Sequence, residues 1–236
     1  MGSHGAVHSM IQVHYVDLDA CIDCVHLWKP VLAPDERLKA DRFRLDIHRN
    51  RYIVGRGVLR QILADRVGAN PVDLSFECGP HGKPRLDSRW PDVCFNLAHS
   101  ESQAVIVTTD RLAVGVDIEV VRVIPDCRSV AHQVFSEREL AELDGADDVN
   151  RAFLNGWTRK EAYVKAIGMG LSAPLRDISV SLSSPAALLS TAVRGDQASD
   201  WTIMDLPHPC SVVALAVPAH HVDLRWCGWY SPSRTA

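Results

Sequence analysis

The sequence predicts an α+β fold with two halves, because the order strand, helices, strands occurs twice along its 236 residues. Two long stretches with apolar residues at helical spacing each end at a glycine, Gly68 in the first half and Gly168 in the second. Short alternating runs separated by turn residues indicate small sheets. We place the join near residues 110–113, which gives an N-terminal half of residues 1–111 and a C-terminal half of residues 112–236.

The first half is predicted to open with a strand at residues 12–16. A helix then begins at Pro34-Asp35-Glu36, because proline suits the first helical turn and acidic side chains favour the positive end of the helix dipole. A second helix is expected at about residues 50–67. The strands expected after it, which we predict to form one antiparallel sheet, are residues 73–77, 93–97, 103–109 and 112–119.

The second half is predicted to contain two helices and a strand-rich tail. Ser136-Glu137-Arg138-Glu139 has the S-x-x-E form of a capping box and predicts a helix that reaches about residue 143. A longer helix is expected at residues 149–167. The expected strands of the tail are residues 178–182, 201–204, 211–217 and 222–226.

Composition and charge exclude several classes of protein. A net charge of −4 argues against a nucleic-acid-binding surface, which needs an excess of lysine and arginine on one face. The longest strongly apolar run, residues 212–217, is far shorter than the ~20 residues of a membrane-spanning helix. With no secretory signal at the start, we expect a cytoplasmic protein. Cys21-Ile22-Asp23-Cys24 is open to two interpretations, a zinc or redox site and ordinary core packing.

Two acidic residues stand out on the strand predicted at residues 112–119. Asp117 and Glu119 project to the same face, with Cα atoms about 6.5 to 7 Å apart, so both can reach one ion. A few hard oxygen ligands, completed by water and phosphate, are what Mg²⁺ prefers. Gly115 is expected to leave that face open. The alternative is a solvated strand face that carries two acids.

A second group of charged residues lies on the helix predicted at residues 149–167. Glu161 and Lys165 share one helix face, one turn after Trp157. An exposed ion pair worth ~0.3 to 0.5 kcal/mol is one explanation. The other is that Glu161 adds a third carboxylate to the ion, or accepts a proton, while Lys165 neutralises a diphosphate. His99 and the turn Gly82-Lys83-Pro84 are weaker signals by themselves.

Four segments, in this order, resemble the 4′-phosphopantetheinyl transferase superfamily, in its Sfp-like (surfactin-synthetase-activating) branch. They are Gly82-Lys83-Pro84, Phe95-Asn96-Leu97-Ala98-His99-Ser100, Gly115-Val116-Asp117-Ile118-Glu119 and Trp157 through Lys165. The resemblance implies a pseudo-twofold pair of similar subdomains, each with helices packed on a small antiparallel sheet, and coenzyme A in the cleft between them. The implied reaction transfers the 4′-phosphopantetheine moiety of coenzyme A to a serine of an acyl or peptidyl carrier protein and releases 3′,5′-ADP.

The resemblance also implies roles for the acidic residues and for the lysine of the long helix. Asp117, Glu119 and Glu161 match the carboxylates that hold Mg²⁺, for which Mn²⁺ can substitute. Lys165 matches the lysine that contacts the pyrophosphate and protonates the leaving group. We assign Glu161 as the base that activates the serine, acting either directly or through a water on the ion.

The nucleotide side of the site is implied by other matches. His99 and Arg51 match residues on the 3′-phosphate, and Lys39 matches a basic residue near the phosphates. The turn Gly82-Lys83-Pro84 matches the segment that lies along the adenine.

The sequence departs from the family pattern at two positions. Ala98 replaces a serine, so its hydroxyl is absent or replaced by that of Ser100. Glu36 stands where relatives often carry a second lysine.

The carrier protein as a partner and two rival functions complete the interpretation. The carrier protein is expected to dock beside Phe153 and the loop at residues 168–171, close to Arg159, on an enzyme that works as a monomer. One rival is a Mg²⁺-dependent phosphodiesterase or nuclease, because three acids and a lysine also suit phosphate-ester hydrolysis. The other is a noncatalytic module that binds coenzyme A or a carrier.

Overall fold

A four-stranded sheet forms the centre of the first half of the protein, whose computed structural model describes residues 9–230. Its strands, in spatial order, are β11 (Val222–Trp229), β1 (Ser9–Asp17), β5 (Gln103–Asp110) and β4 (Val93–Ser100). β1 runs antiparallel to β5 and parallel to β11, and β4 runs antiparallel to β5.

The last strand therefore belongs to the first sheet. β11 pairs along β1 from Ser9 with Val222 to Tyr15 with Trp229. The predicted C-terminal half of residues 112–236 is wrong for this strand, because the chain returns across the molecule to cover the free edge of β1. A pairing between segments two hundred residues apart leaves no local pattern in the sequence.

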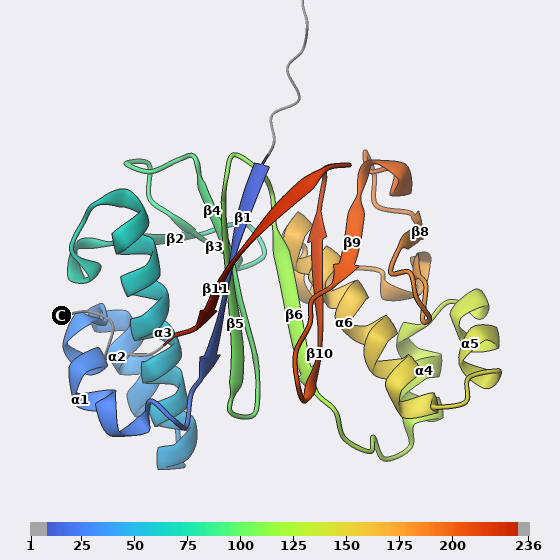
Figure 1. Cartoon of the computed structure of the whole chain (residues 1–236), viewed down its shortest axis with the longest axis horizontal. Helices are drawn as coiled ribbons and strands as arrows, with labels where there is room; N and C mark the ends of the chain where they lie inside the picture. Colours follow the sequence, from blue (N-terminus) through green and yellow to red (C-terminus); the bar gives the residue numbers. More distant parts are fainter. Residues whose placement is uncertain (1–8, 231–236) are drawn as a thin grey trace, which may run out of the picture.

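Three helices cover the outer face of the first sheet, as Figure 1 shows: α1 (Val25–Trp28), α2 (Pro34–Asp41) and α3 (Asp46–Val67). The predicted start of α2 and end of α3 are confirmed. Gly68, at φ 69°, takes the left-handed conformation that stops α3. The buried face of α3 packs on the sheet through apolar side chains that include Ile53, Leu59 and Leu63.

A second, three-stranded sheet lies beside the first, in the order β6 (Gly115–Val120), β10 (Ser211–Val217) and β9 (Thr202–Asp205). The prediction of one antiparallel sheet across residues 73–119 is therefore wrong. β6 pairs with β10, and its apolar face, which carries Val116, packs against the face of the first sheet instead of extending its edge. The strand predicted at residues 73–77 is β2 (Phe76–Cys78), and it forms a separate hairpin with β3 (Pro84–Leu86), which was not predicted.

The second half carries its helices on the other side of its sheet (Figure 1): α4 (Cys127–Val134), α5 (Glu137–Asp144) and α6 (Val149–Ile167). The capping box of α5 and both ends of α6 are confirmed. A small hairpin, β7 (Ile178–Val180) with β8 (Leu188–Thr191), completes this half. The α+β class is thus confirmed, and pseudo-twofold symmetry stays a prediction.

The remaining short helices are 3₁₀ turns at Ile22–Cys24, Lys29–Val31, Pro71–Asp73, Gly170–Ser172, Leu175–Asp177 and Ala198–Asp200. No helix within residues 9–230 is both long and apolar enough to cross a membrane.

Gly115 brings α6 and β6 unusually close together. A Cβ atom at this position would collide with the backbone of α6 at Ala162 and Ala166. The expectation that Gly115 leaves an open face is therefore wrong, because a helix fills that space. Glycine is needed here so that the two elements can meet backbone to backbone.

Candidate active site

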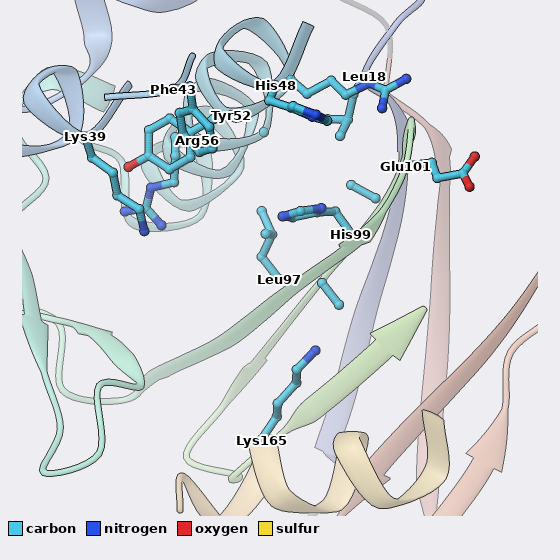
Figure 2. A pocket seen from close by; sticks show the side chains of 14 residues that line it. Leu18, Lys39, Phe43, His48, Tyr52, Arg56, Leu97, His99, Glu101 and Lys165 are labelled. Carbon is cyan, nitrogen blue, oxygen red and sulfur yellow. The ribbon is translucent and has the colours of Figure 1, made fainter. Parts of the chain in front are cut away.

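A cavity of about 700 Å³ opens between the helices of the first half and the end of β4. Figure 2 shows Lys39, Arg56 and His48 approaching it from one side and Lys165 from the other. The lysine and arginine side chains that line the cavity are those of Lys39, Arg51, Arg56 and Lys165, and the imidazoles of His48 and His99 lie among them. This concentration of positive charge suits a ligand with several phosphate groups.

Lys165 connects the cavity to the acidic residues of β6. Its Nζ lies 2.5 Å from Oδ1 of Asp117, whose other oxygen, Oδ2, is buried without a hydrogen-bond partner. Burial raises the pKa of Asp117 to about 7 although Lys165 opposes the shift, and nearby Glu161 and Glu119 raise it further. Asp117 therefore has an unsatisfied oxygen in an acidic environment.

The other two carboxylates lie close enough to influence Asp117 and each other. Burial raises the pKa of Glu161, and the charge of Glu119 raises it further while Lys165 lowers it. Glu119 accepts hydrogen bonds at Oε2 from Ser100 (2.8 Å) and Arg122 (3.0 Å). β6 and α6 thus bring all three predicted acids into one electrostatic group.

These carboxylates have the donor chemistry that a divalent cation needs. Within residues 9–230, no three His, Cys, Asp or Glu side chains form a group arranged to hold an ion. Lys165 occupies one oxygen of Asp117, and two donors share one oxygen of Glu119. The unpartnered oxygen of Asp117 and the raised pKa values of two acids indicate a site that added positive charge would stabilise. The residues fit Mg²⁺ in donor type.

The predicted nucleotide-binding residues of the first half also line this cavity. Arg51 is held by Asp19, through Nε to Oδ1 at 2.7 Å and Nη2 to Oδ2 at 2.6 Å. Lys39 lies over the ring of Tyr52, 5.3 Å from its centre. The pKa of His99 is lowered by partial burial and by the surrounding cations, Lys165 before the others. The structure therefore gathers Lys39, Arg51, His99 and Lys165 around one space.

The predicted adenine segment lies elsewhere. Gly82, Lys83 and Pro84 are absent from the lining of the cationic cavity, and Lys83 and Pro84 line a second cavity of about 470 Å³ at the opposite end of β4. Nζ of Lys83 points into the protein, where it donates to the backbone oxygens of Val114 and Ala166, both at 2.9 Å. The assignment of this turn to the adenine stays a prediction.

The two departures from the family pattern have structural explanations. Glu36 is buried and accepts hydrogen bonds from Arg56 (2.7 Å) and Arg60 (2.6 Å), so its charge is neutralised away from the cavity. Ser100 donates its hydroxyl hydrogen to Glu119. That hydrogen is therefore committed, and Ser100 does not replace the hydroxyl that is missing at Ala98.

The expected docking surface is wrong at Phe153 and Arg159, while docking at the loop of residues 168–171 stays a prediction. Phe153 is only 4% exposed and packs against Phe135 and Trp157, because this face of α6 forms part of the core. Arg159 has no exposed surface and pairs with Asp205 at 2.6 Å. A carrier protein cannot reach either side chain in this structure.

Two cavity residues, His48 and Arg56, were not predicted from the sequence. With Tyr52 they recur every four residues along α3, so all three lie on one helix face. This four-residue repeat of basic and aromatic side chains along one face of the helix is the signal that identifies them.

Comparison with known proteins agrees with this arrangement. The family model of the 4′-phosphopantetheinyl transferase superfamily matches residues 113–216. The 4′-phosphopantetheinyl transferase HetI of Nostoc is 34% identical over 215 residues, covering 83% of this chain and 88% of HetI. The 4′-phosphopantetheinyl transferase Sfp of Bacillus subtilis is 31% identical over 153 residues, covering 64% of this chain and 66% of Sfp.

A more distant relative spans most of the chain as well. The phosphopantetheinyl transferase of Thraustochytrium is 26% identical over 211 residues, covering 81% of this chain and 72% of that protein. The chain therefore belongs to the 4′-phosphopantetheinyl transferase superfamily and is an enzyme of this class.

Proposed function

We propose that the cationic cavity binds coenzyme A and that Asp117, Glu119 and Glu161 hold Mg²⁺, or Mn²⁺ in its place, beside the diphosphate. The enzyme transfers 4′-phosphopantetheine to a serine of an acyl or peptidyl carrier protein and releases 3′,5′-ADP. One observation carries this proposal: cations from the first half and Lys165 from the second converge on one cavity of about 700 Å³, and Lys165 also contacts Asp117.

The nucleotide side of the proposed site belongs to the first half. Lys39, Arg51 and His99 surround the cavity, and a further cation, Arg56, lies beside Lys39 (Figure 2). Guanidinium groups bind phosphate through paired hydrogen bonds, while the lysine acts as a point charge. Glu36 also pairs with Arg60, so the group of Arg56, Arg60 and Glu36 keeps one net positive charge on the side where Glu36 replaces a lysine.

The metal side belongs to the second half. Mg²⁺, when bound, offsets the negative charge of the diphosphate. Both sides of the site come from a single chain, which supports activity as a monomer. Within residues 9–230 the cysteines are unpaired, which suits a reducing cytoplasm.

The proposed reaction is a phosphoryl-type transfer with little covalent chemistry for the protein. The serine oxygen forms a bond to the β-phosphorus of coenzyme A as the anhydride bond breaks, and the electron pair stays on 3′,5′-ADP. Glu161 takes the serine proton, because it is the carboxylate that α6 places in the group with Asp117 and Glu119, one helical turn before Lys165. Lys165 neutralises the charge that develops on the departing phosphate.

The test is a mass measurement on a panel of apo carrier proteins incubated with enzyme, coenzyme A and Mg²⁺. We expect at least one carrier to gain the mass of one phosphopantetheine group on its serine, and none to do so without the metal. Coenzyme A binding with every carrier unmodified would favour the noncatalytic module. Cleavage of DNA or of a phosphodiester without carrier modification would favour the hydrolase.

Arg56→Gln is expected to raise the KM for coenzyme A about tenfold with little change in kcat, because it removes one charged phosphate contact made in both the ground state and the transition state. Arg66→Gln is the matched control, since Arg66 lies on the same helix and pairs with Asp110 outside the cavity. A smaller effect with 3′-dephospho-coenzyme A would place Arg56 at the 3′-phosphate. An unchanged KM would remove Arg56 from the site.

A further inference from the structure

Lys83 connects three segments that are distant in the sequence. It lies in the turn between β2 and β3, and its Nζ donates to the oxygen of Val114, just before β6, and to the oxygen of Ala166, in the last turn of α6. Burial lowers the pKa of Lys83 to about 8. The side chain is therefore buried at the contact between β6 and α6 and is not a free surface cation.

The bond from Lys83 to Ala166 satisfies a backbone oxygen at the C-terminal end of α6. The amides of Gly168 and Met169 both bond to Val164, which leaves the oxygen of Ala166 to be satisfied by another donor. A lysine is well suited, since cations stabilise the negative end of the helix dipole. The Lys83 stem packs against Gly168, since a Cβ at Gly168 would lie 3.4 Å from Cδ of Lys83.

The two elements that Lys83 joins carry all the proposed catalytic groups. Asp117 and Glu119 project from β6, and Glu161 and Lys165 project from α6. Lys83 donates to the oxygen of Val114, three residues before Asp117, and to the oxygen of Ala166, the residue after Lys165. Together with the backbone approach at Gly115, these two hydrogen bonds set the distance between β6 and α6 beside the 2.5 Å contact of Lys165 with Asp117.

We propose that Lys83 is a positioning residue, which fixes β6 against α6 and so holds the carboxylates and Lys165 in register, and that its side chain does not contact the nucleotide. This inference rests on the proposed function of those groups. Loss of the two hydrogen bonds would leave two backbone oxygens unpaired and let β6 shift relative to α6. A displacement of about 1 Å between reacting groups costs on the order of a hundredfold in rate.

The first test compares Lys83→Met with Thr202→Val, which removes a side-chain hydrogen bond to the backbone oxygen of Ala219 in the same half. In Lys83→Met we expect kcat to fall between tenfold and a hundredfold, as the rate argument above implies, and the KM for coenzyme A to stay within about twofold. Thr202→Val should retain its kcat. A raised KM with unchanged kcat, or equal losses in both variants, would overturn the proposal.

Two further measurements do not depend on turnover. Hydrogen exchange at the amides of residues 114–120 and 160–168 should accelerate in Lys83→Met and not in Thr202→Val. In the protein without substitutions, addition of coenzyme A should change the NMR chemical shift of the Lys39 side chain and leave that of the Lys83 side chain unchanged. A Lys83 shift as large as that of Lys39 would overturn the proposal even if the variant fails to fold, whereas a protein that modifies no carrier would contradict only the proposed function.

Discussion

Glu161→Gln is expected to reduce kcat for carrier modification by about a thousandfold, within the range of 10² to 10⁴ that general base catalysis contributes. The substitution removes the proposed proton acceptor and one carboxylate of the metal site in a single change. Glutamine has nearly the same shape, and the raised pKa of Glu161 shows that its charge is not stabilised in the folded metal-free protein. The thermal unfolding temperature without metal should therefore be unchanged or slightly higher.

The matched control is Glu101→Gln. Glu101 lines the same cavity, but its carboxylate points away from the other labelled side chains in Figure 2. Turnover is measured by mass spectrometry of the carrier at saturating coenzyme A, and Mg²⁺ affinity by calorimetry. Near-native turnover in Glu161→Gln would remove Glu161 from the mechanism. Weakened Mg²⁺ binding in that variant, and not in Glu101→Gln, would support its role as a ligand.

Lys160→Met is expected to lower the free energy of unfolding by about 3 to 5 kcal/mol, because it leaves a buried carboxylate without its partner. Nζ of Lys160 lies 2.7 Å from Glu139 Oε2 and donates to the backbone oxygens of Val134 and Leu175. Both side chains of the ion pair are almost completely buried. The lysine next to the proposed base is thus a structural residue that ties α6 to α5.

Two variants separate this role from catalysis, with unfolding followed in urea by circular dichroism. The double variant Lys160→Met with Glu139→Leu should recover part of the lost stability, since neither charge then remains buried alone. Lys165→Met should instead abolish turnover and lower stability less than Lys160→Met, because Asp117, whose pKa is already raised to about 7, can take up a proton when Lys165 is lost. Unchanged stability in Lys160→Met would contradict the structural role.

The helices of this protein could be predicted because their signals are local. Pro34 at the start of α2, the capping box at Ser136 and the glycines after α3 and α6 act within one or two helical turns. The very short α1 and the hairpin strands β3 and β8 carry too few residues for a periodic pattern and were missed. The helix α4 was missed as well, because it begins without a side-chain cap. The pairing of β6 with β10 was also missed, since register between distant strands is a tertiary property.

The site was predictable to the extent that its residues share an element. Alternation along β6 placed Asp117 and Glu119 on one face, and helical spacing placed Glu161 with Lys165 on α6. Lys160 and Lys165 belong to the same motif, yet only the structure separates a buried tie from a cavity cation. Lys160 lies on the side of α6 that is buried against α5, whereas Lys165 lies on the side that reaches the cavity.

What the sequence determined by itself was the α+β class, the two long helices and the identity of the charged groups, because these depend on residue type and on contacts within a few turns. The tertiary structure alone decided where those charges point. It turned Lys83 and Glu36 inward, assembled a cavity from Lys39, Arg56, His99 and Lys165, and carried the last strand back to β1. Burial and long-range packing set these outcomes, since a charged side chain faces a ligand or the interior according to the partners that other segments bring to it.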